Sequence, residues 1–167
     1  MKFHVLAVII FSSALCGCGG DGRPSLVEVE GAVTLDGEPI GGAQLAFIPD
    51  AGNEIQRGSR ATSDSGGKFT VGTYAVNDGI PVGKYKVTVI KEELDGELPE
   101  GYNTEDPSAN AKPMKMKLFT PEHYSLPDQT DLTVEVTSDG MSPATIALEG
   151  GGGPVIKTQG GRPADEP

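Results

Sequence analysis

Thiol and imidazole side chains, which serve in much covalent and metal chemistry, are few in this 167-residue sequence. The two cysteines, Cys16 and Cys18, lie one residue apart near the N-terminus, and the two histidines are His4 and His123. A disulfide between Cys16 and Cys18 would be strained, because only one residue separates them. A zinc site normally needs several His, Cys or carboxylate ligands. We therefore expect no metal centre and no cofactor, and the two thiols need another explanation.

The cysteines follow an apolar segment that is typical of a secretory signal peptide. Lys2 supplies a positive start, and residues 3–15 are apolar apart from three polar side chains. The run is too short to span a bilayer, which takes about 20 apolar residues, but it has the length of a signal-peptide core. The alternative is a buried helix, which the flexible Gly-Gly-Asp-Gly segment at 19–22 disfavours. We predict an N-terminal signal helix within residues 1–17 that is removed during export.

Residues 15–18 resemble the lipobox of bacterial lipoproteins, in which the modified cysteine follows a small residue and lies three positions after an aliphatic one. Leu15 and Gly17 occupy these positions if Cys18 is modified, with Cys16 between them. Modification of Cys16 would instead place the bulky Leu15 at the cleavage site. The resemblance implies cleavage between Gly17 and Cys18. It also implies that Cys18 carries three acyl chains, palmitate among them, which would hold the protein on a membrane indefinitely.

The charge of the processed chain limits the possible partners. Because residues 1–17 contain one of the 13 basic residues and none of the 24 acidic ones, the remaining chain has a net charge of −12. This balance argues against nucleic acid and against electrostatic adhesion to anionic lipid. We expect attachment through the acyl chains alone, with residues 18–25 as the lipidated tether. Gly19 after the anchor, rather than Asp, favours the outer over the inner membrane by analogy with enterobacterial sorting.

An alternation of apolar and polar residues recurs along residues 26–149 and predicts short β-strands. No segment after residue 17 has a convincing helical period. These features predict an all-β sandwich, although the spacing alone would also allow a small barrel. The seven expected strands lie within residues 27–35, 43–47, 57–63, 68–71, 84–91, 132–136 and 146–148.

Asp-Gly pairs mark the expected turns. Asp36-Gly37 and the Asp-Ser-Gly-Gly run at 64–67 supply the positive φ angles that hairpin turns require. Their carboxylates, together with Glu38, are also candidate calcium ligands. Turn chemistry explains these residues without an ion, and their spacing lacks the ligand series of an EF-hand. We assign no metal to them.

Two residues within the expected strands carry specific expectations. Gly31 falls on the apolar side of its strand, where a glycine often marks a bulge or a close approach of backbone. Tyr85 can bury its ring while its hydroxyl finds a partner near the end of the sheet.

Two regions fall outside the strand scheme. Residues 92–117 form a charged insertion, acidic in its first part and basic at its end, that is too long for an ordinary connection in a compact domain. Residues 150–167 open with four glycines and contain too little apolar surface to order themselves. We predict that this C-terminal tail is disordered.

Several of the turn and strand motifs resemble carboxypeptidase-regulatory-like, transthyretin-like (prealbumin-like) domains over residues 27–149. The resemblance implies a seven-stranded Greek-key-type (transthyretin-like / immunoglobulin-like) sandwich. The motifs specify turns and core strands, so they bear on fold rather than on function. They are VTLDGEPI at 33–40 with AQLAFIP at 43–49, TSDSGGKF at 62–69 (the family's TDxxGxF turn with Ser63 between Thr and Asp), GKYKVTV at 83–89 (its PGxYxVxV strand with Val82 for proline), PEHY at 121–124, and LTVEV at 132–136.

The chemistry-bearing residues do not predict an enzyme. Enzymatic relatives of this sandwich use several histidines, whereas His123 is the only histidine left after cleavage. A Ser-His-Asp triad would need His123, and no Gly-x-Ser-x-Gly elbow is present. We expect a membrane-anchored, non-catalytic envelope lipoprotein that acts as a structural or protein-interaction module.

The partner of such a module is not identified by the sequence. The insertion at 92–117 is where a partner contact would be sought, but a mobile solvated loop is the favoured interpretation of it. The second functional hypothesis is a carbohydrate-binding module at the cell surface. Sugar sites usually display aromatic platforms, but this chain has no Trp and only four scattered tyrosines, at 74, 85, 102 and 124.

Overall fold

The structure is a computed structural model that describes residues 23–98, 102, 113–150 and 152–159. Within these residues the chain is mostly β-strand, with one short 3-10 helix, η2 (Glu122–Ser125), and no α-helix. None of the described residues belongs to a helix long and apolar enough to cross a membrane. The expected signal helix lies outside the described residues.

The first sheet is built around β1 (Glu30–Leu35). One edge of β1 pairs in parallel with β11 (Thr145–Leu148). The other edge pairs with two short antiparallel strands, β5 (Lys68–Thr70) and β2 (Glu38–Pro39). β1 is therefore hydrogen-bonded on both sides.

The second sheet is antiparallel throughout and contains the longest strand. β6 (Gly83–Ile90) lies at its centre, between β3 (Gln44–Pro49) and β9 (Thr133–Thr137). The outer strands are β4 (Ser59–Thr62), next to β3, and β10 (Gly140–Ser142), next to β9. The edge position of β4 agrees with its weak apolar pattern.

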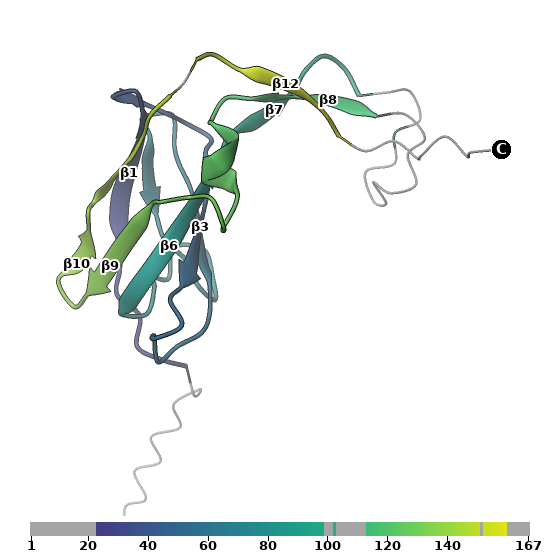
Figure 1. Ribbon diagram of the computed structural model, residues 1–167. Helices are drawn as coiled ribbons and strands as arrows, with labels where there is room; N and C mark the ends of the chain where they lie inside the picture. Colours follow the sequence, from purple (N-terminus) through teal and green to yellow (C-terminus); the bar gives the residue numbers. More distant parts are fainter. Residues whose placement is uncertain (1–22, 99–101, 103–112, 151, 160–167) are drawn as a thin grey trace, which may run out of the picture.

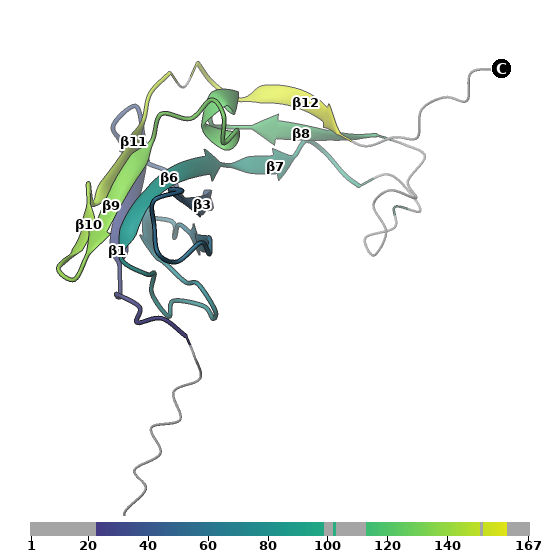
Figure 2. The ribbon, with the colours of Figure 1, turned by 60° about the horizontal axis from the view of Figure 1, so that its bottom comes forward.

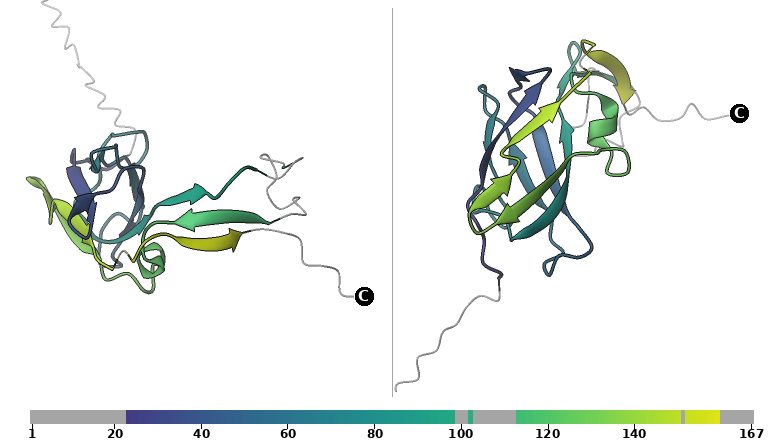
Figure 3. Two further views of the ribbon diagram at one scale, coloured as in Figure 1. Left: turned by 90° about the horizontal axis from the view of Figure 1, so that it is seen from above. Right: turned by 60° about the vertical axis from the view of Figure 1, so that its left-hand side comes forward.

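The two sheets face each other (Figures 1 and 3), and their inner faces share one hydrophobic core. Strict alternation along β6 places Tyr85, Val87 and Val89 at 1% exposure or less. Phe47 and Phe69 come from opposite sheets, and their ring centroids lie 6.1 Å apart. The remaining core members from both sheets include Val29, Val33, Leu45, Val71, Val134, Val136, Ile146 and Leu148.

The all-β, sandwich-like prediction is confirmed, and each of the seven expected strands has a counterpart, in β1, β3, β4, β5, β6, β9 and β11. The close approach at Gly31 is also confirmed: an added Cβ would lie 2.8 Å from the Ala144 carbonyl oxygen. Tyr85 donates its hydroxyl to the Pro81 carbonyl at 2.7 Å, as expected. Two short strands, β2 and β10, were not foreseen.

A third, three-stranded sheet projects from one end of this two-sheet body (Figures 2 and 3). It contains β7 (Glu92–Leu94), β8 (Met114–Leu118) and β12 (Val155–Gln159), with β8 in the middle. We call this sheet the arm. β7 continues almost directly from β6, so the arm extends the second sheet beyond the core.

The arm corrects two expectations. The tail is not disordered throughout, because residues 155–159 pair with all five residues of β8. The insertion is not a plain loop at its ends, since residues 92–94 and 114–118 form a hairpin ladder. The physical reason is the same for both. Each segment orders by pairing with a strand distant in sequence, which local composition does not reveal.

Candidate functional site

The predicted lipidation residue Cys18 and the cleavage residue Gly17 lie outside the described residues. The described chain, which starts at residue 23, begins at the end of the two-sheet body opposite to the arm, where the purple start of the ribbon lies (Figures 1 and 2). A lipid attached before Arg23 would therefore leave the arm pointing away from the attachment end.

His123 is exposed on η2, and its ring packs against the neighbouring tyrosine. Its ring centroid lies 3.9 Å from that of Tyr124. Tyr124 is buried, and its hydroxyl accepts the backbone N–H of Glu149 at 3.1 Å. These contacts fix η2 against the end of β11. Among the described residues, no group of three or more His, Cys, Asp or Glu side chains is arranged to hold a metal ion.

The two candidate calcium segments are turns. Asp64 Oδ1 accepts the backbone N–H groups of Gly66 and Lys68, at 2.8 and 2.9 Å. Asp36 and Gly37 have φ angles of 52° and 87°, which a tight hairpin turn requires. The carboxylates therefore stabilise backbone groups within the fold.

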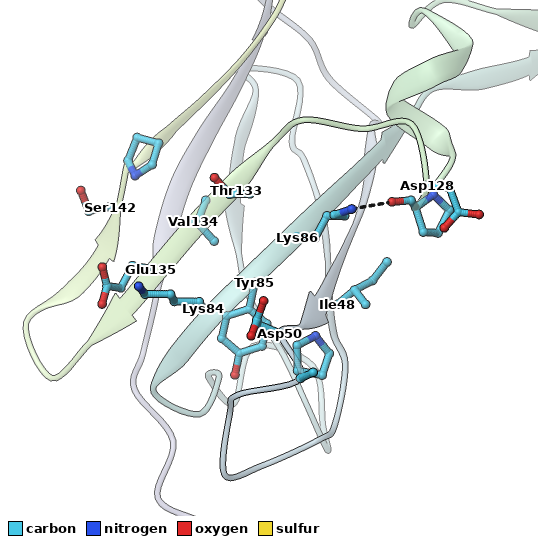
Figure 4. A pocket seen from close by; sticks show the side chains of 14 residues that line it. Ile48, Asp50, Lys84, Tyr85, Lys86, Asp128, Thr133, Val134, Glu135 and Ser142 are labelled. Carbon is cyan, nitrogen blue, oxygen red and sulfur yellow. Dashed lines mark hydrogen bonds between the residues drawn. The ribbon is translucent and has the colours of Figure 1, made fainter.

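A shallow depression of about 700 Å³ lies on the outer face of the second sheet (Figure 4). Lys84, Lys86 and Glu135 line it from neighbouring strands, and Lys86 donates to the Pro127 carbonyl at 3.0 Å. The ring of Tyr85 is buried, and burial raises the pKa of its hydroxyl. This surface combines apolar side chains with charges of both signs and has no exposed aromatic platform.

A second depression, of about 860 Å³, contains a group of cationic side chains that the sequence did not single out. Arg57 and Arg60 line it together with Tyr74. The guanidinium carbon of Arg57 lies 4.5 Å from the Tyr74 ring centroid, and that of Arg23 lies 5.0 Å from it. Both distances are within the range of cation–π attraction. We call these three arginines with Tyr74 the arginine cluster.

The loop that carries Tyr74 is held by one carboxylate. Asp78 accepts the backbone N–H groups of Thr73 at 2.6 Å and Ala75 at 2.8 Å, and that of Tyr74 at 3.1 Å. These bonds, led by the one from Thr73, lower the pKa of Asp78 although desolvation opposes them. Because the Thr73 hydroxyl donates to Gly79, it accepts the hydrogen of the Ser59 hydroxyl, 2.7 Å away.

The arm combines ion pairs, one of them to η2, with exposed apolar side chains. Lys117 lies 3.8 Å from Asp95, and Lys157 pairs with Glu122. Val155 is 58% exposed and Ile156 is 47% exposed. In the described part of the chain β12 pairs only with β8, so its other edge is open.

The arginine cluster was missed because its members are scattered in sequence. Arg23 precedes the first strand, Arg57 and Arg60 flank the start of β4, and Tyr74 follows β5. The one local signal is the pair of arginines three residues apart beside an edge strand. Only the fold brings them to one surface.

Comparison with protein-family models, with curated proteins and with solved structures gives no match for this chain. Its function is therefore argued from its own residues and surfaces.

Proposed function

We propose that this protein is a non-catalytic envelope lipoprotein, anchored to a membrane through acylated Cys18, that binds a protein partner on its arm. The Leu15–Cys18 pattern after an apolar segment supports the anchor. The arm lies at the end of the body opposite to the start of the described chain (Figure 1). Anchoring at Cys18 would thus hold the arm out into the envelope space.

The observation that carries the proposal is the open edge of β12. An edge strand presents unpaired backbone N–H and C=O groups, and soluble proteins usually protect such edges with charges, bulges or proline. Here the strand instead exposes Val155 and Ile156, while Lys157 is neutralised by Glu122. An open apolar edge of this kind accepts an extended segment of another protein by strand addition. The proposed partner is therefore an extended segment of an envelope protein.

The charged insertion supports the same role. Its acidic start and basic end lie side by side in the hairpin of β7 and β8, where Glu93 is opposite Lys117. The charges therefore stabilise the arm itself and leave its apolar edge as the feature available to a partner.

For the fold we propose the Greek-key, transthyretin-like or immunoglobulin-like sandwich in preference to a small barrel. The strands form two separate hydrogen-bonded sheets around one core. The Tyr85 hydroxyl bonds the carbonyl four residues upstream, which is similar to the tyrosine corner of Greek-key sandwiches. The folded sandwich then serves as a rigid support between anchor and arm.

The carbohydrate-binding alternative has less support. Tyr85 and Tyr124 are buried, and the ring of Tyr74 lies against two guanidinium groups. A sugar site on the outer sheet face would have to bind its ligand through Lys84, Glu135 and their neighbours without a stacking platform.

We propose the outer membrane as the site of anchoring, because Gly19 follows the cysteine.

Site-specific photo-crosslinking in cells tests the arm. A photo-reactive amino acid at Ile156 should crosslink one defined envelope protein. The matched control is Val82, which is similarly exposed at 54% but precedes β6 in the two-sheet body. Equal crosslinking of the same protein from both positions, or none from Ile156, would overturn the proposal.

Mass spectrometry of the purified protein tests the anchor. The expected N-terminal peptide begins at Cys18 and carries the acyl chains. Cys18→Ala should move the protein from the membrane to the soluble fraction. An unprocessed or unacylated N-terminus contradicts the lipoprotein assignment.

A further inference from the structure

The arginine cluster is an unusual feature for a chain with this many acidic residues. Arg23, Arg57 and Arg60 are all exposed, and two of them lie against the same Tyr74 ring. Arginine next to tyrosine is well suited to phosphate, because the guanidinium donates several hydrogen bonds while the ring supports its flat face.

The loop beside the cluster presents a single apolar tip. Val76 is 90% exposed, the highest exposure of any large apolar side chain among the described residues. The loop is rigid, since the Asp78 carboxylate holds three consecutive backbone N–H groups from Thr73 to Ala75. Gly72 is also tightly packed, because an added Cβ would lie 2.3 Å from the Ala75 carbonyl oxygen. An isolated exposed valine is ordinary, but this one is fixed beside the arginines.

The distance to the proposed lipid is short. Arg23 follows Cys18 by five residues, and an extended chain covers at most about 3.6 Å per residue, or about 18 Å in total. An acylated Cys18 lies at the bilayer surface. The backbone of Arg23 must then lie within about 18 Å of that surface, and the Tyr74 ring lies against the Arg23 side chain.

Screening determines which charges matter at this distance. At physiological ionic strength the Debye length is about 8 Å, so acids on the distant arm, such as Glu93 and Asp95, do not oppose contact at this end. The carboxylate of Asp78, on the Tyr74 loop, already accepts backbone hydrogen bonds. Glu54 precedes Arg57 by three residues and is exposed. The three arginines therefore place positive charge at this end although the whole chain is acidic.

We propose that Arg23, Arg57 and Arg60 bind lipid headgroup phosphates, with Val76 entering the interface, so that the sandwich stands on the bilayer by this end. This inference rests on the acylation of Cys18 proposed above. The acyl chains attach the protein, and the arginine cluster fixes its orientation. The arm then projects away from the membrane rather than lying along it.

Fluorescence quenching on vesicles tests this contact. The acylated protein, reconstituted into phosphatidylethanolamine–phosphatidylglycerol vesicles, is labelled at Val76→Cys or, for comparison, at Ile156→Cys. Spin-labelled headgroups should quench the probe at position 76 several-fold more than the probe at position 156. Equal quenching at the two positions would overturn the orientation.

A matched pair of charge variants tests the arginines themselves. Arg57→Gln with Arg60→Gln should reduce quenching at position 76 to the level of the arm. Lys68→Gln with Lys84→Gln removes the same charge from other exposed positions and should leave it unchanged. Equal effects of the two pairs would contradict the proposal.

The salt dependence of the quenching tests the headgroup contact without any arginine variant. Quenching at position 76 should fall as NaCl shortens the Debye length from about 10 Å at 0.1 M to about 3 Å at 1 M. At matched ionic strength, excess inorganic phosphate should not displace the probe, and displacement would assign the cluster to free phosphate instead.

Flotation distinguishes failure of the anchor from failure of the headgroup contact. An unacylated protein fails to float with vesicles at all, whereas an acylated protein with an unquenched probe disproves only the headgroup contact.

Discussion

The two-sheet body and the arm use the same strand pairing but differ in what covers their faces. In β6, alternate side chains such as Val87 and Val89 are fully buried against the opposite sheet. In β12, Val155 and Ile156 are adjacent residues on opposite faces, and both are about half exposed. The body is therefore stabilised by burial of apolar side chains. The arm depends on its hydrogen-bond ladder and a few ion pairs.

Because of this difference, we expect the body to determine the stability of the fold and the arm to determine partner binding. Substitutions in the body should change the free energy of unfolding, and substitutions on the arm should change partner binding with little effect on the fold.

The largest effect is expected in the core. Phe47→Ala removes a ring that is 1% exposed and packs against Phe69, and such truncations cost about 3–5 kcal/mol. Ile156→Ala on the arm should change the free energy of unfolding by about 0.5 kcal/mol or less, as for most surface positions. Urea denaturation of both variants measures the contrast. A loss at Ile156 as large as that at Phe47 would mean that the arm is part of the core.

The next effect concerns backbone packing. In Gly31→Ala the new methyl would lie 2.5 Å from the Phe69 ring edge and 2.8 Å from the Ala144 carbonyl oxygen. Overpacking of this kind costs about 1–3 kcal/mol. Gly152→Ala, before β12, meets nothing within 4 Å and should be close to neutral. Thermal unfolding of the two variants distinguishes them, and similar midpoints would refute the close packing around Gly31.

Gly31 and Tyr85 show what the sequence could predict. The alternation of apolar and polar residues placed both residues on the apolar side of a strand. That position alone predicted the close approach at Gly31 and the buried hydrogen bond of Tyr85. Period-2 patterns and Asp-Gly turns are local, so the strands of the body could be located without the structure.

The arm and the arginine cluster show what could not be predicted. β12 has only five residues and no apolar face, and its order comes from β8, more than thirty residues earlier. Arg23 and Tyr74 are separated by five strands, β1 to β5, and meet only in the fold. The sequence shows that the insertion is acidic at its start and basic at its end. Only the structure shows that these charges pair, because the hairpin places Lys117 beside Asp95.

A smaller effect is expected from the buried tyrosine hydroxyl. Tyr85→Phe leaves the ring in place but removes the bond to the Pro81 carbonyl, at a cost of about 1 kcal/mol. The raised pKa of Tyr85 also predicts a pH dependence. The unfolded side chain ionises near its ordinary pKa of 10.0 while the folded one stays protonated, so stability should fall as the pH rises above that value.

The measurement is the free energy of unfolding between neutral pH and pH 11. Tyr85→Phe should lack part of the alkaline loss that the unsubstituted protein shows. Tyr74→Phe is the control, because its hydroxyl makes no hydrogen bond with the described residues. An identical alkaline slope in the Tyr85 and Tyr74 variants would show that burial of Tyr85 does not govern it.

The smallest effect on global stability is expected from the ion pair of the arm. The side chains of Lys117 and Asp95 are 39% and 36% exposed, and exposed pairs contribute about 0–1 kcal/mol. Lys117→Met should therefore leave the unfolding midpoint almost unchanged. It should instead speed hydrogen exchange at the amides of β7 and β8, because regions with few buried contacts open without global unfolding. Amides of β6 serve as the internal reference, and their exchange should not change. If arm amides exchanged only as slowly as those of β6, the arm and the body would unfold as one unit, and β12 would be a structural edge rather than a surface held ready for a partner.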